Sequence, residues 1–198
     1  MKLSKDFYYD KDVVKLSQKL LGKVLFVRTN RITTAGIITE TEAYVGFNDR
    51  ASHAYNGRRT PRNEIMYADG GTAYVYLCYG IHSLFNVVTN EKDIPHAILV
   101  RAVYPVEGIK HIAKRRLRDD PAKMATGPGS VSEALGIRLE DNGVELTGSK
   151  IWIEDQGISF PKKNILSGPR IGVESSGTSA LLPYRFWVKH AELKTMGI

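Results

Sequence analysis

The chain has 198 residues, 42% hydrophobic and 25% charged, which is ordinary globular composition and excludes a disordered, collagen-like or coiled-coil chain. A formal net charge of +7 makes a polyanion, such as nucleic acid or an acidic membrane surface, the partner class to test. The lone Cys78 excludes an internal disulfide and a thiolate metal cluster. No apolar run approaches the ~20 residues of a membrane span, and the N-terminus lacks a signal peptide's apolar core. We therefore expect a soluble, intracellular protein (cytoplasmic or nucleoid-bound if prokaryotic) with no membrane partner.

The N-terminal third is expected to form a short helix and then two strands. The helix is expected to begin at a cap at Asp10 and to end at Gly22. The hydrophobic period then changes, which favours strands at residues 23–28 and 32–45. Residues 46–71 are polar and rich in turn-forming residues, so they predict a long, mostly irregular loop. A loop of that length in a compact domain is typically functional or disordered.

In the rest of the chain, three strands are expected before two helices, and two further strands after them. Pro105 is expected to begin a helix that runs to about Arg118, and Gly127-Pro128-Gly129 precedes a short helix that ends near Gly136. Further strands are expected at residues 73–78, 82–89, 97–104, 150–154 and 184–189. Because the strands occur in runs, the fold class is α+β, with a largely antiparallel sheet and a few short helices. No stretch reads as an interdomain linker, so residues 1–198 are expected to form a single domain.

The segment around Glu40 and Glu42 is the first candidate for chemistry. Side chains alternate along a strand, so Glu40, Glu42 and Tyr44 share one face. If that face lines a cleft, repulsion between the two carboxylates raises one pKa and produces a general base. The alternative is a solvated strand face, which is the more common context of an isolated pair. The loop that follows, with His53 and several arginines, favours the cleft.

Three further features leave a structural and a functional interpretation open. Tyr79 lies at a hairpin tip, from which an aromatic side chain can wedge into a base stack. Asn86 interrupts an apolar strand, either as a structural bridge or as a substrate reader. Arg101 interrupts another apolar strand, with the two glutamates as candidate partners.

The basic residues of the loop and of the predicted helix are either solvated or contact phosphates. They are Arg50, Arg58, Arg59, Arg62, Lys110, Lys114, Arg115, Arg116 and Arg118.

Motifs of other enzyme classes are missing from the sequence. The five histidines show no metal-ligand spacing, and there is no phosphate-binding loop, dinucleotide fingerprint or nucleophile elbow. We therefore expect neither a metal nor a cofactor.

Residues 38–67 (ITETEAYVGFNDRASHAYNGRRTPRNEIMY), 70–88 (GGTAYVYLCYGIHSLFNVV) and 97–108 (AILVRAVYPVEG) together closely resemble the alkyladenine (3-methyladenine) DNA glycosylase family. The similarity extends over nearly the whole chain. It implies a compact α+β domain with a curved antiparallel sheet. It also implies an enzyme that flips damaged purines out of duplex DNA and hydrolyses the N-glycosidic bond, leaving an abasic site. The implied substrates are 3-methyladenine, 7-methylguanine, hypoxanthine and ethenoadenine. The implied partner is double-stranded DNA that contains such a purine. We expect the protein to be a monomer.

The resemblance also implies roles for individual residues. Glu42 matches the glutamate that activates water, while Arg101 and the backbone carbonyl of Ile171 match the groups that hold this water. Asn86 matches an asparagine that rejects guanine, and Tyr79 matches the residue that fills the gap in the duplex. The residues that match the stacking pocket are Tyr44, His53 and Tyr76. The arginines expected to contact DNA are Arg58, Arg59 and Arg62.

Two other classes of function stay open at this stage. Glu40 and Glu42, as neighbours on one strand face, lie roughly in the ~6.5–9.5 Å range of an inverting polysaccharide glycosidase. A non-enzymatic DNA-binding module is the second alternative, and it would tolerate loss of Glu42. No lysine matches the pocket, so a glycosylase of this type is expected to use water, without strand cleavage.

Overall fold

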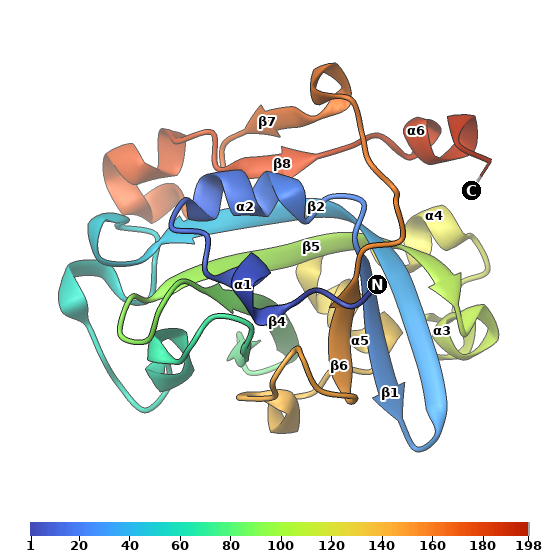
Figure 1. The fold of residues 1–198 in the computed structure, drawn as a ribbon, viewed down its shortest axis with the longest axis horizontal. Coiled ribbons are helices and arrows are strands. Elements are labelled where there is room, and N and C mark those ends of the chain that lie inside the picture. Colours follow the sequence, from blue (N-terminus) through green and yellow to red (C-terminus); the bar gives the residue numbers. More distant parts are fainter. Residues whose placement is uncertain (198) are drawn as a thin grey trace.

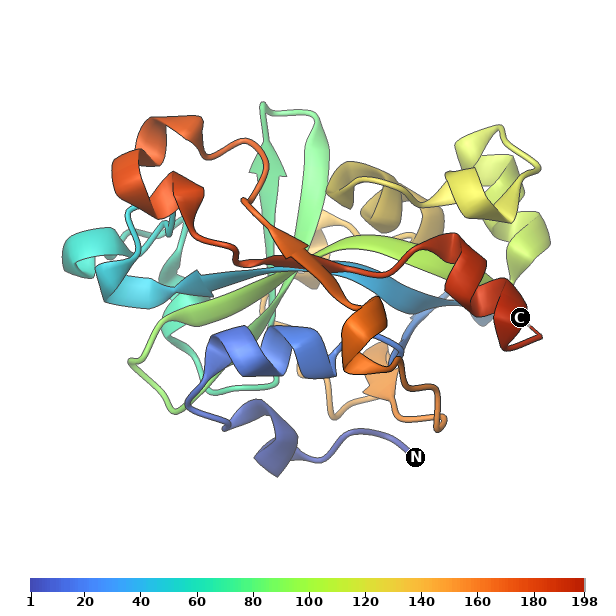
Figure 2. The same cartoon turned by 90° about the horizontal axis from the view of Figure 1, so that it is seen from above.

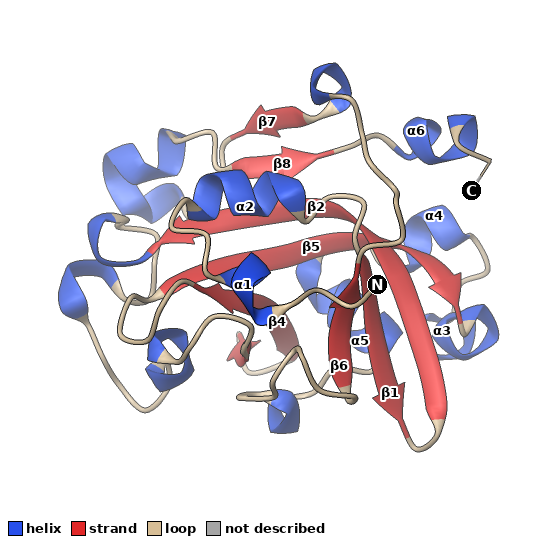
Figure 3. Ribbon diagram, in the orientation of Figure 1, coloured by secondary structure: helices blue, strands red, loops and turns tan. Residues whose placement is uncertain are grey.

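The computed structural model describes residues 1–197, and its centre is an antiparallel sheet in which the long strands β2 and β5 lie side by side (Figure 1). The sheet order is β3-β4-β5-β2-β1-β6, while β8 pairs with the second half of β2 and β7 pairs with β8. The strands, drawn in red in Figure 3, are β1 (Val24–Thr29), β2 (Ile32–Val45), β3 (Ala73–Cys78), β4 (His82–Thr89), β5 (His96–Glu107), β6 (Ile151–Glu154), β7 (Leu166–Gly168) and β8 (Arg185–Trp187).

Short helices cover both faces of this sheet. In the view from above, α1 and α2 lie on one side, while α3, α4 and α5 lie on the other (Figure 2). The α-helices are α1 (Lys5–Tyr8), α2 (Val13–Lys19), α3 (Ile109–Arg116), α4 (Pro121–Met124), α5 (Pro128–Leu135) and α6 (His190–Thr195). None of these helices within residues 1–197 combines the length and apolar character needed to cross a bilayer. The α+β class and the curved antiparallel sheet expected from the sequence are confirmed.

Two predicted helix starts are wrong, each for a local reason. The cap of α2 is Asp12, whose side chain accepts a hydrogen bond from the Lys15 N–H at 2.9 Å, whereas Asp10 pairs with Lys19. Pro105 does not begin a helix, because β5 continues through it to Glu107. Its missing N–H is tolerated since a register shift occurs there in the pairing with β2. The helix begins after Gly108, which has a φ of +66°.

The remaining predicted elements are largely confirmed. Residues 46–71 form an excursion with short 3-10 turns at Gly46–Asn48, Tyr55–Gly57 and Glu64–Tyr67. Further 3-10 segments occur at Leu139–Asp141, Lys162–Asn164 and Glu174–Leu181. The elements missed by the sequence analysis are the short pieces α1, α4, α6 and β7. Three to six residues carry too little periodicity to be recognised, and tertiary contacts decide their conformation.

The pairing of β2 with β5 contains two adjacent irregularities. The register runs from Ile38 opposite Val103 to Glu40 opposite Ala102, and then to Thr41 opposite Val100, so Thr39 and Arg101 are the extra residues. Bulges of this kind re-aim side chains and are frequent beside functional sites. Here the bulged strand segments carry the charged residues described next.

Candidate active site

Glu42 is a completely buried carboxylate in the second half of β2. The Tyr44 hydroxyl donates a hydrogen bond to its Oε2 at 2.9 Å, and the Ile171 N–H donates to its Oε1 at 2.8 Å. A terminal guanidinium nitrogen of Arg101 lies 3.4 Å from Oε1. Both oxygens are therefore held by donors from three separate parts of the chain, as the low tolerance of protein interiors for unpaired charge requires.

Burial raises the pKa of Glu42 above its ordinary value, and this is the largest influence on it. Arg101, the Ile171 N–H and the Tyr44 hydroxyl each lower the pKa, without cancelling the effect of burial. Repulsion by Glu40 also raises it, as the sequence analysis expected, but is the smallest of the named causes. The raised pKa thus comes mainly from desolvation rather than from the paired carboxylates.

Glu40 and Arg101 lie on the same side of the sheet as Glu42. Arg101 donates from Nε to Glu40 Oε1 at 3.1 Å, and Arg185 of β8 donates to the same oxygen at 3.2 Å. On the opposite face, Thr41 and Ser17 of α2 exchange hydrogen bonds. The predicted alternation of faces is therefore confirmed, and the glutamate face is the one turned towards the cleft residues Tyr44 and Arg101.

A cleft of about 470 Å³ lies directly in front of this carboxylate. It is lined by residues from the β3–β4 hairpin, the loop of residues 46–71, the start of α5 and residues 171–173. Glu42 itself lies one layer behind the wall, in contact with three of the lining residues. The lining residues that the sequence analysis singled out are Tyr44, His53, Arg62, Tyr76, Tyr79, Asn86, Arg101 and Ile171.

Aromatic rings form one wall of the cleft. The rings of His53 and Tyr76 meet edge to face with centroids 4.7 Å apart, and the rings of Tyr74 and Tyr76 are 5.3 Å apart. His53 Nδ1 lies 2.9 Å from the Tyr74 hydroxyl. Loss of hydration and the charges of Arg62 and Arg58 lower the pKa of His53, while burial raises the pKa of Tyr76 to about 12. At neutral pH this wall is therefore uncharged.

Asn86 is 3% exposed, lies on β4 and lines the cleft. Its side-chain Nδ2 donates to the carbonyl oxygens of Tyr74 and Leu84, at 3.1 and 3.4 Å. These two acceptors decide which end of the amide is nitrogen. Within residues 1–197 no protein donor reaches Oδ1. The structure thus shows the bridging role, and it leaves the carbonyl end of the amide available to the cleft.

Tyr79 lies at the tip of the β3–β4 hairpin and is 91% exposed. Tyr79 and Gly80 have φ values of +52° and +72°, the left-handed conformation that tight hairpin turns require. Arg62 packs over the ring of Tyr76 and donates to the Leu77 carbonyl at 3.1 Å, next to this tip. The ring of Tyr79 is accordingly presented to solvent at the rim of the cleft.

The other arginines expected to contact DNA, Arg58 and Arg59, differ in whether a carboxylate of the protein pairs with them. Arg59 pairs with both Glu64 and Asp93, so its charge is compensated within the protein. No carboxylate within residues 1–197 pairs with the side chain of Arg58. In α3, two members of the predicted basic face have structural contacts: Arg115 donates to the Ala134 carbonyl, and Arg116 pairs with Glu133.

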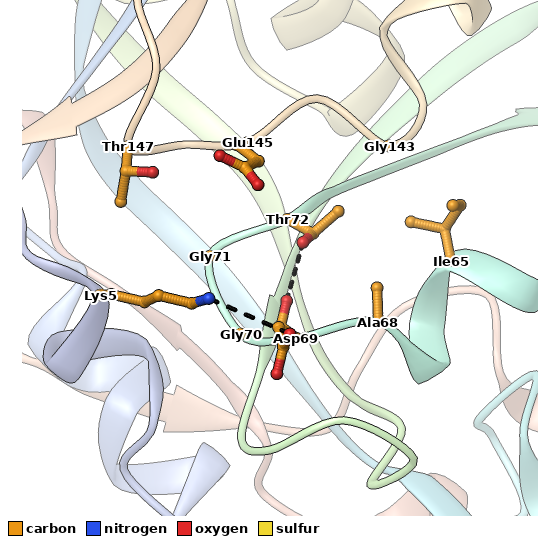
Figure 4. A pocket seen from close by; sticks show the side chains of 10 residues that line it. All are labelled: Lys5, Ile65, Ala68, Asp69, Gly70, Gly71, Thr72, Gly143, Glu145 and Thr147. Atoms are coloured by element: carbon orange, nitrogen blue, oxygen red, sulfur yellow. Dashed lines mark hydrogen bonds and ion pairs between the residues drawn. The ribbon is translucent and has the colours of Figure 1, made fainter.

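A second, smaller hollow of about 270 Å³ shares no lining residue with the cleft (Figure 4). It lies between α1, the turn before β3 and residues 143–147. Lys5, Asp69 and Glu145 bring charges of both signs to it, and these side chains are open to solvent. It contains none of the residues singled out from the sequence. Elsewhere too, residues 1–197 contain no group of three or more His, Cys, Asp or Glu side chains placed to hold a metal ion.

The sequence analysis did not identify Arg170 and Asp49, which form a buried ion pair next to Glu42's contacts. They are 121 residues apart, so no local spacing signals the pair. Ile171 was singled out for its carbonyl, but the contact that the structure shows is made by its N–H, which donates to Glu42.

A sequence model of the methylpurine-DNA glycosylase (MPG) family matches residues 7–192. The chain belongs to this family. It is 44% identical over 186 residues to a Chlamydia pneumoniae protein, with 93% of each chain covered. It is 41% identical to a Bacillus subtilis protein (91% and 90% covered) and 37% identical to a Clostridium perfringens protein (96% of each covered). All three are named "Putative 3-methyladenine DNA glycosylase". The resemblance seen in the sequence is confirmed, and membership makes the chain a DNA glycosylase of base excision repair.

Proposed function

We propose that this DNA glycosylase flips damaged purines into the aromatic cleft and hydrolyses their N-glycosidic bond with a water molecule activated by Glu42. The observation that carries the proposal is the position of Glu42, a buried carboxylate with a raised pKa immediately behind a cleft that is lined by aromatic rings. A base inside a duplex hides its glycosidic bond, so extrusion must precede the chemistry. The proposed products are a free purine and an abasic site.

Glu42 has the properties of a general base. Each of its oxygens accepts one hydrogen bond within the protein, and a carboxylate oxygen can accept two. Arg101 spans Glu40 and Glu42, and a guanidinium has donors left over after these contacts. We assign to Arg101 and to the Ile171 carbonyl the holding of the attacking water. As the bond breaks, the sugar acquires oxocarbenium character, which the Glu42 carboxylate stabilises.

The cleft supports recognition of the base by stacking and by steric exclusion. Tyr44, His53 and Tyr76 would contact the faces and edge of a flipped purine. Asn86 would act as the purine filter, because its amide is fixed by two backbone carbonyls and cannot swing away from an exocyclic amino group. Tyr79 would occupy the gap left in the duplex.

The pKa pattern of the cleft favours bases that already carry a positive charge. A neutral base such as hypoxanthine needs a proton as it departs, whereas 3-methyladenine does not. The lowered pKa of His53 leaves it neutral near pH 7, and the raised pKa of Tyr76 makes it a weak acid. We therefore expect faster release of cationic alkylated purines than of neutral lesions.

The glycosidase alternative requires two carboxylates that are free to act on one sugar. Glu40 accepts hydrogen bonds from both Arg101 and Arg185, so its negative charge is compensated. Its geometry suits the positioning of Arg101 rather than acid or base catalysis. The family assignment likewise favours an enzyme on DNA over a non-catalytic DNA-binding module.

The test is base release from a panel of duplexes, each with one lesion: 3-methyladenine, 7-methylguanine, hypoxanthine or ethenoadenine. Chromatography of the free base and alkali-dependent strand cleavage measure the two products, with an undamaged duplex as the control. We expect release from at least one lesion duplex, unaffected by a strong chelator, and no cleavage before alkali. Absence of release from every duplex would overturn the function. Cleavage without alkali would overturn the water mechanism, and inactivation by the chelator would show a metal requirement.

A further inference from the structure

Arg170 and Asp49 form an ion pair that is sealed from solvent. Their side chains are 0% and 1% exposed. One terminal nitrogen of Arg170 donates to Asp49 Oδ1 at 2.8 Å, and the other donates to Asp49 Oδ2 and to the Ala43 carbonyl at 2.8 Å. Such a two-pronged contact fixes both partners in orientation as well as in distance.

The pair joins segments that are remote in sequence. Asp49 also accepts from the N–H groups of Val45 and Ala51, which fixes the start of the loop that leads to His53. Arg170 donates further to the Ser179 carbonyl at 3.0 Å. The end of β2, the loop after it and the segments around residues 170 and 179 thus meet at one guanidinium.

Two neighbours of this ion pair contact Glu42, the proposed general base. The guanidinium of Arg170 lies over the ring of Tyr44, 4.7 Å from its centroid, and Tyr44 donates to Glu42. The residue after Arg170 is Ile171, whose N–H donates to the other oxygen of Glu42. Two of the three contacts that hold this carboxylate are therefore adjacent to Arg170, in space or in sequence.

Stability alone is a weak reason for such a pair. Taking two charges out of water costs several kcal/mol per ion, and well-packed apolar residues commonly give equal or greater stability. A role in positioning the reacting group is a stronger reason for this pair, because small displacements of catalytic groups have large effects on the rate.

We infer that Arg170 and Asp49 are positioning residues, which hold the Ile171 N–H and the Tyr44 ring in place so that both donors stay on Glu42. This inference rests on the proposed function, because it concerns the same carboxylate. Arg170 is sealed from solvent and does not line the cleft, so it acts through Tyr44 and Ile171.

The direct test is Arg170→Lys, which retains the charge but has no planar fork. It cannot maintain all the contacts to Asp49, Ala43 and Ser179, so residues 170–171 move relative to Glu42. A displacement of about 1 Å at such a site lowers rates by about 10²-fold, so we expect the single-turnover rate of base release to fall by ~10- to 100-fold. The Ile171 and Tyr44 hydrogen bonds lower the pKa of Glu42, so their loss moves the acidic limb of the pH–rate profile to higher pH.

Asp49→Asn is the second variant, because it keeps the shape and one acceptor if Arg170→Lys fails to fold. Lys150→Met is the matched control, since Lys150 pairs with the buried Asp141 and neither residue lines the cleft. It is expected to lower the melting temperature without moving the limb. The wild type is assayed alongside, on the same lesion duplex.

A shifted limb in Arg170→Lys or Asp49→Asn, with an unshifted limb in Lys150→Met, supports the positioning role. If the acidic limb of the pH–rate profile is unshifted in a folded Arg170→Lys or Asp49→Asn variant, the positioning role is wrong. The proposed glycosylase function still stands in that case, provided that the wild type releases the damaged base. If both variants fail to fold, the pair is structural and the inference is wrong. Lack of release by the wild type removes the function, and the positioning role with it.

Discussion

The cleft floor (Arg101 and Ile171, with Glu42 directly behind them) and the hairpin tip (Tyr79 and Gly80) differ in how much of their candidate functional side chains is exposed to water. In the floor a carboxylate is completely buried and held by donors from β2, β5 and residue 171. At the tip an aromatic side chain is 91% exposed on a left-handed backbone. The floor keeps charges away from water at a cost in stability, whereas the tip keeps apolar surface in water.

This difference separates two roles. A buried, hydrogen-bonded carboxylate is preorganised and needs no rearrangement when the reaction begins. An exposed ring does nothing for the fold but is free to enter a base stack. Changes in the floor are therefore expected to alter the chemical step and stability. Changes at the tip are expected to alter DNA binding, with stability unchanged.

The largest effect is expected from Glu42→Gln. The variant keeps the size of the side chain; its amide oxygen can still accept from the Ile171 N–H, while its NH2 group can donate to the Tyr44 hydroxyl oxygen in place of the present bond. It cannot accept a proton, so base release should fall at least ~10²-fold while lesion binding persists. Because the folded-state pKa of Glu42 lies above its unfolded value, the ionised group costs stability, fully so above the folded pKa. The neutral variant should therefore melt at a higher temperature than the wild type at neutral pH. Single-turnover assays and thermal melts measure both, and near-normal turnover would contradict the assignment.

The next largest effect is expected from Tyr79→Asn. Asparagine accepts the left-handed backbone at this position, so the hairpin should form as before. Loss of the stacking ring removes ~1–3 kcal/mol from the complex, which lowers the affinity for a lesion duplex by roughly 5- to 150-fold. Fluorescence anisotropy measures the affinity, and thermal melting is the control. A lowered melting temperature with unchanged affinity would show that Tyr79 contributes to stability and not to DNA binding, contrary to the role proposed for the tip.

Asn86→Ser tests whether Asn86, which lines the cleft, excludes guanine as proposed. Serine is shorter and leaves the Tyr74 and Leu84 carbonyls without their donor, so some loss of stability is expected. If the amide excludes guanine, the variant should also release guanine, changing the ratio of guanine to hypoxanthine release by about tenfold. Uniformly weaker release from all duplexes, at unchanged ratios, would identify Asn86 as purely structural.

The smallest effects are expected from Arg58→Ala and Arg59→Ala, compared with each other. A phosphate contact adds about one to the slope of log affinity against log salt concentration. Arg58→Ala should reduce that slope by about one, whereas Arg59→Ala should leave it unchanged because Glu64 and Asp93 already compensate Arg59. Binding titrations from low to moderate salt measure both slopes. Equal reductions would mean that Arg59 leaves its partners on binding DNA.

Much of the site was predictable because it is encoded locally. Strand alternation correctly placed Glu40, Glu42 and Tyr44 on one face, and the turn signal at Tyr79 correctly predicted an exposed tip. The length of the polar loop also indicated a functional segment, and its residues His53 and Arg62 line the cleft. These features depend on residues within a few positions of one another, which is the range over which periodicity and turn chemistry act.

The sequence by itself determined the α+β class, the positions of the long strands along the chain and which residues share a strand face with the two carboxylates. The tertiary structure decided the rest, because it depends on groups that meet only after folding. The bulges at Thr39 and Arg101 are set by the pairing of β2 with β5, and Arg170 meets Asp49 across 121 residues. Burial, rather than the nearby Glu40, is the main cause of the raised pKa of Glu42, and burial is a property of the assembled core.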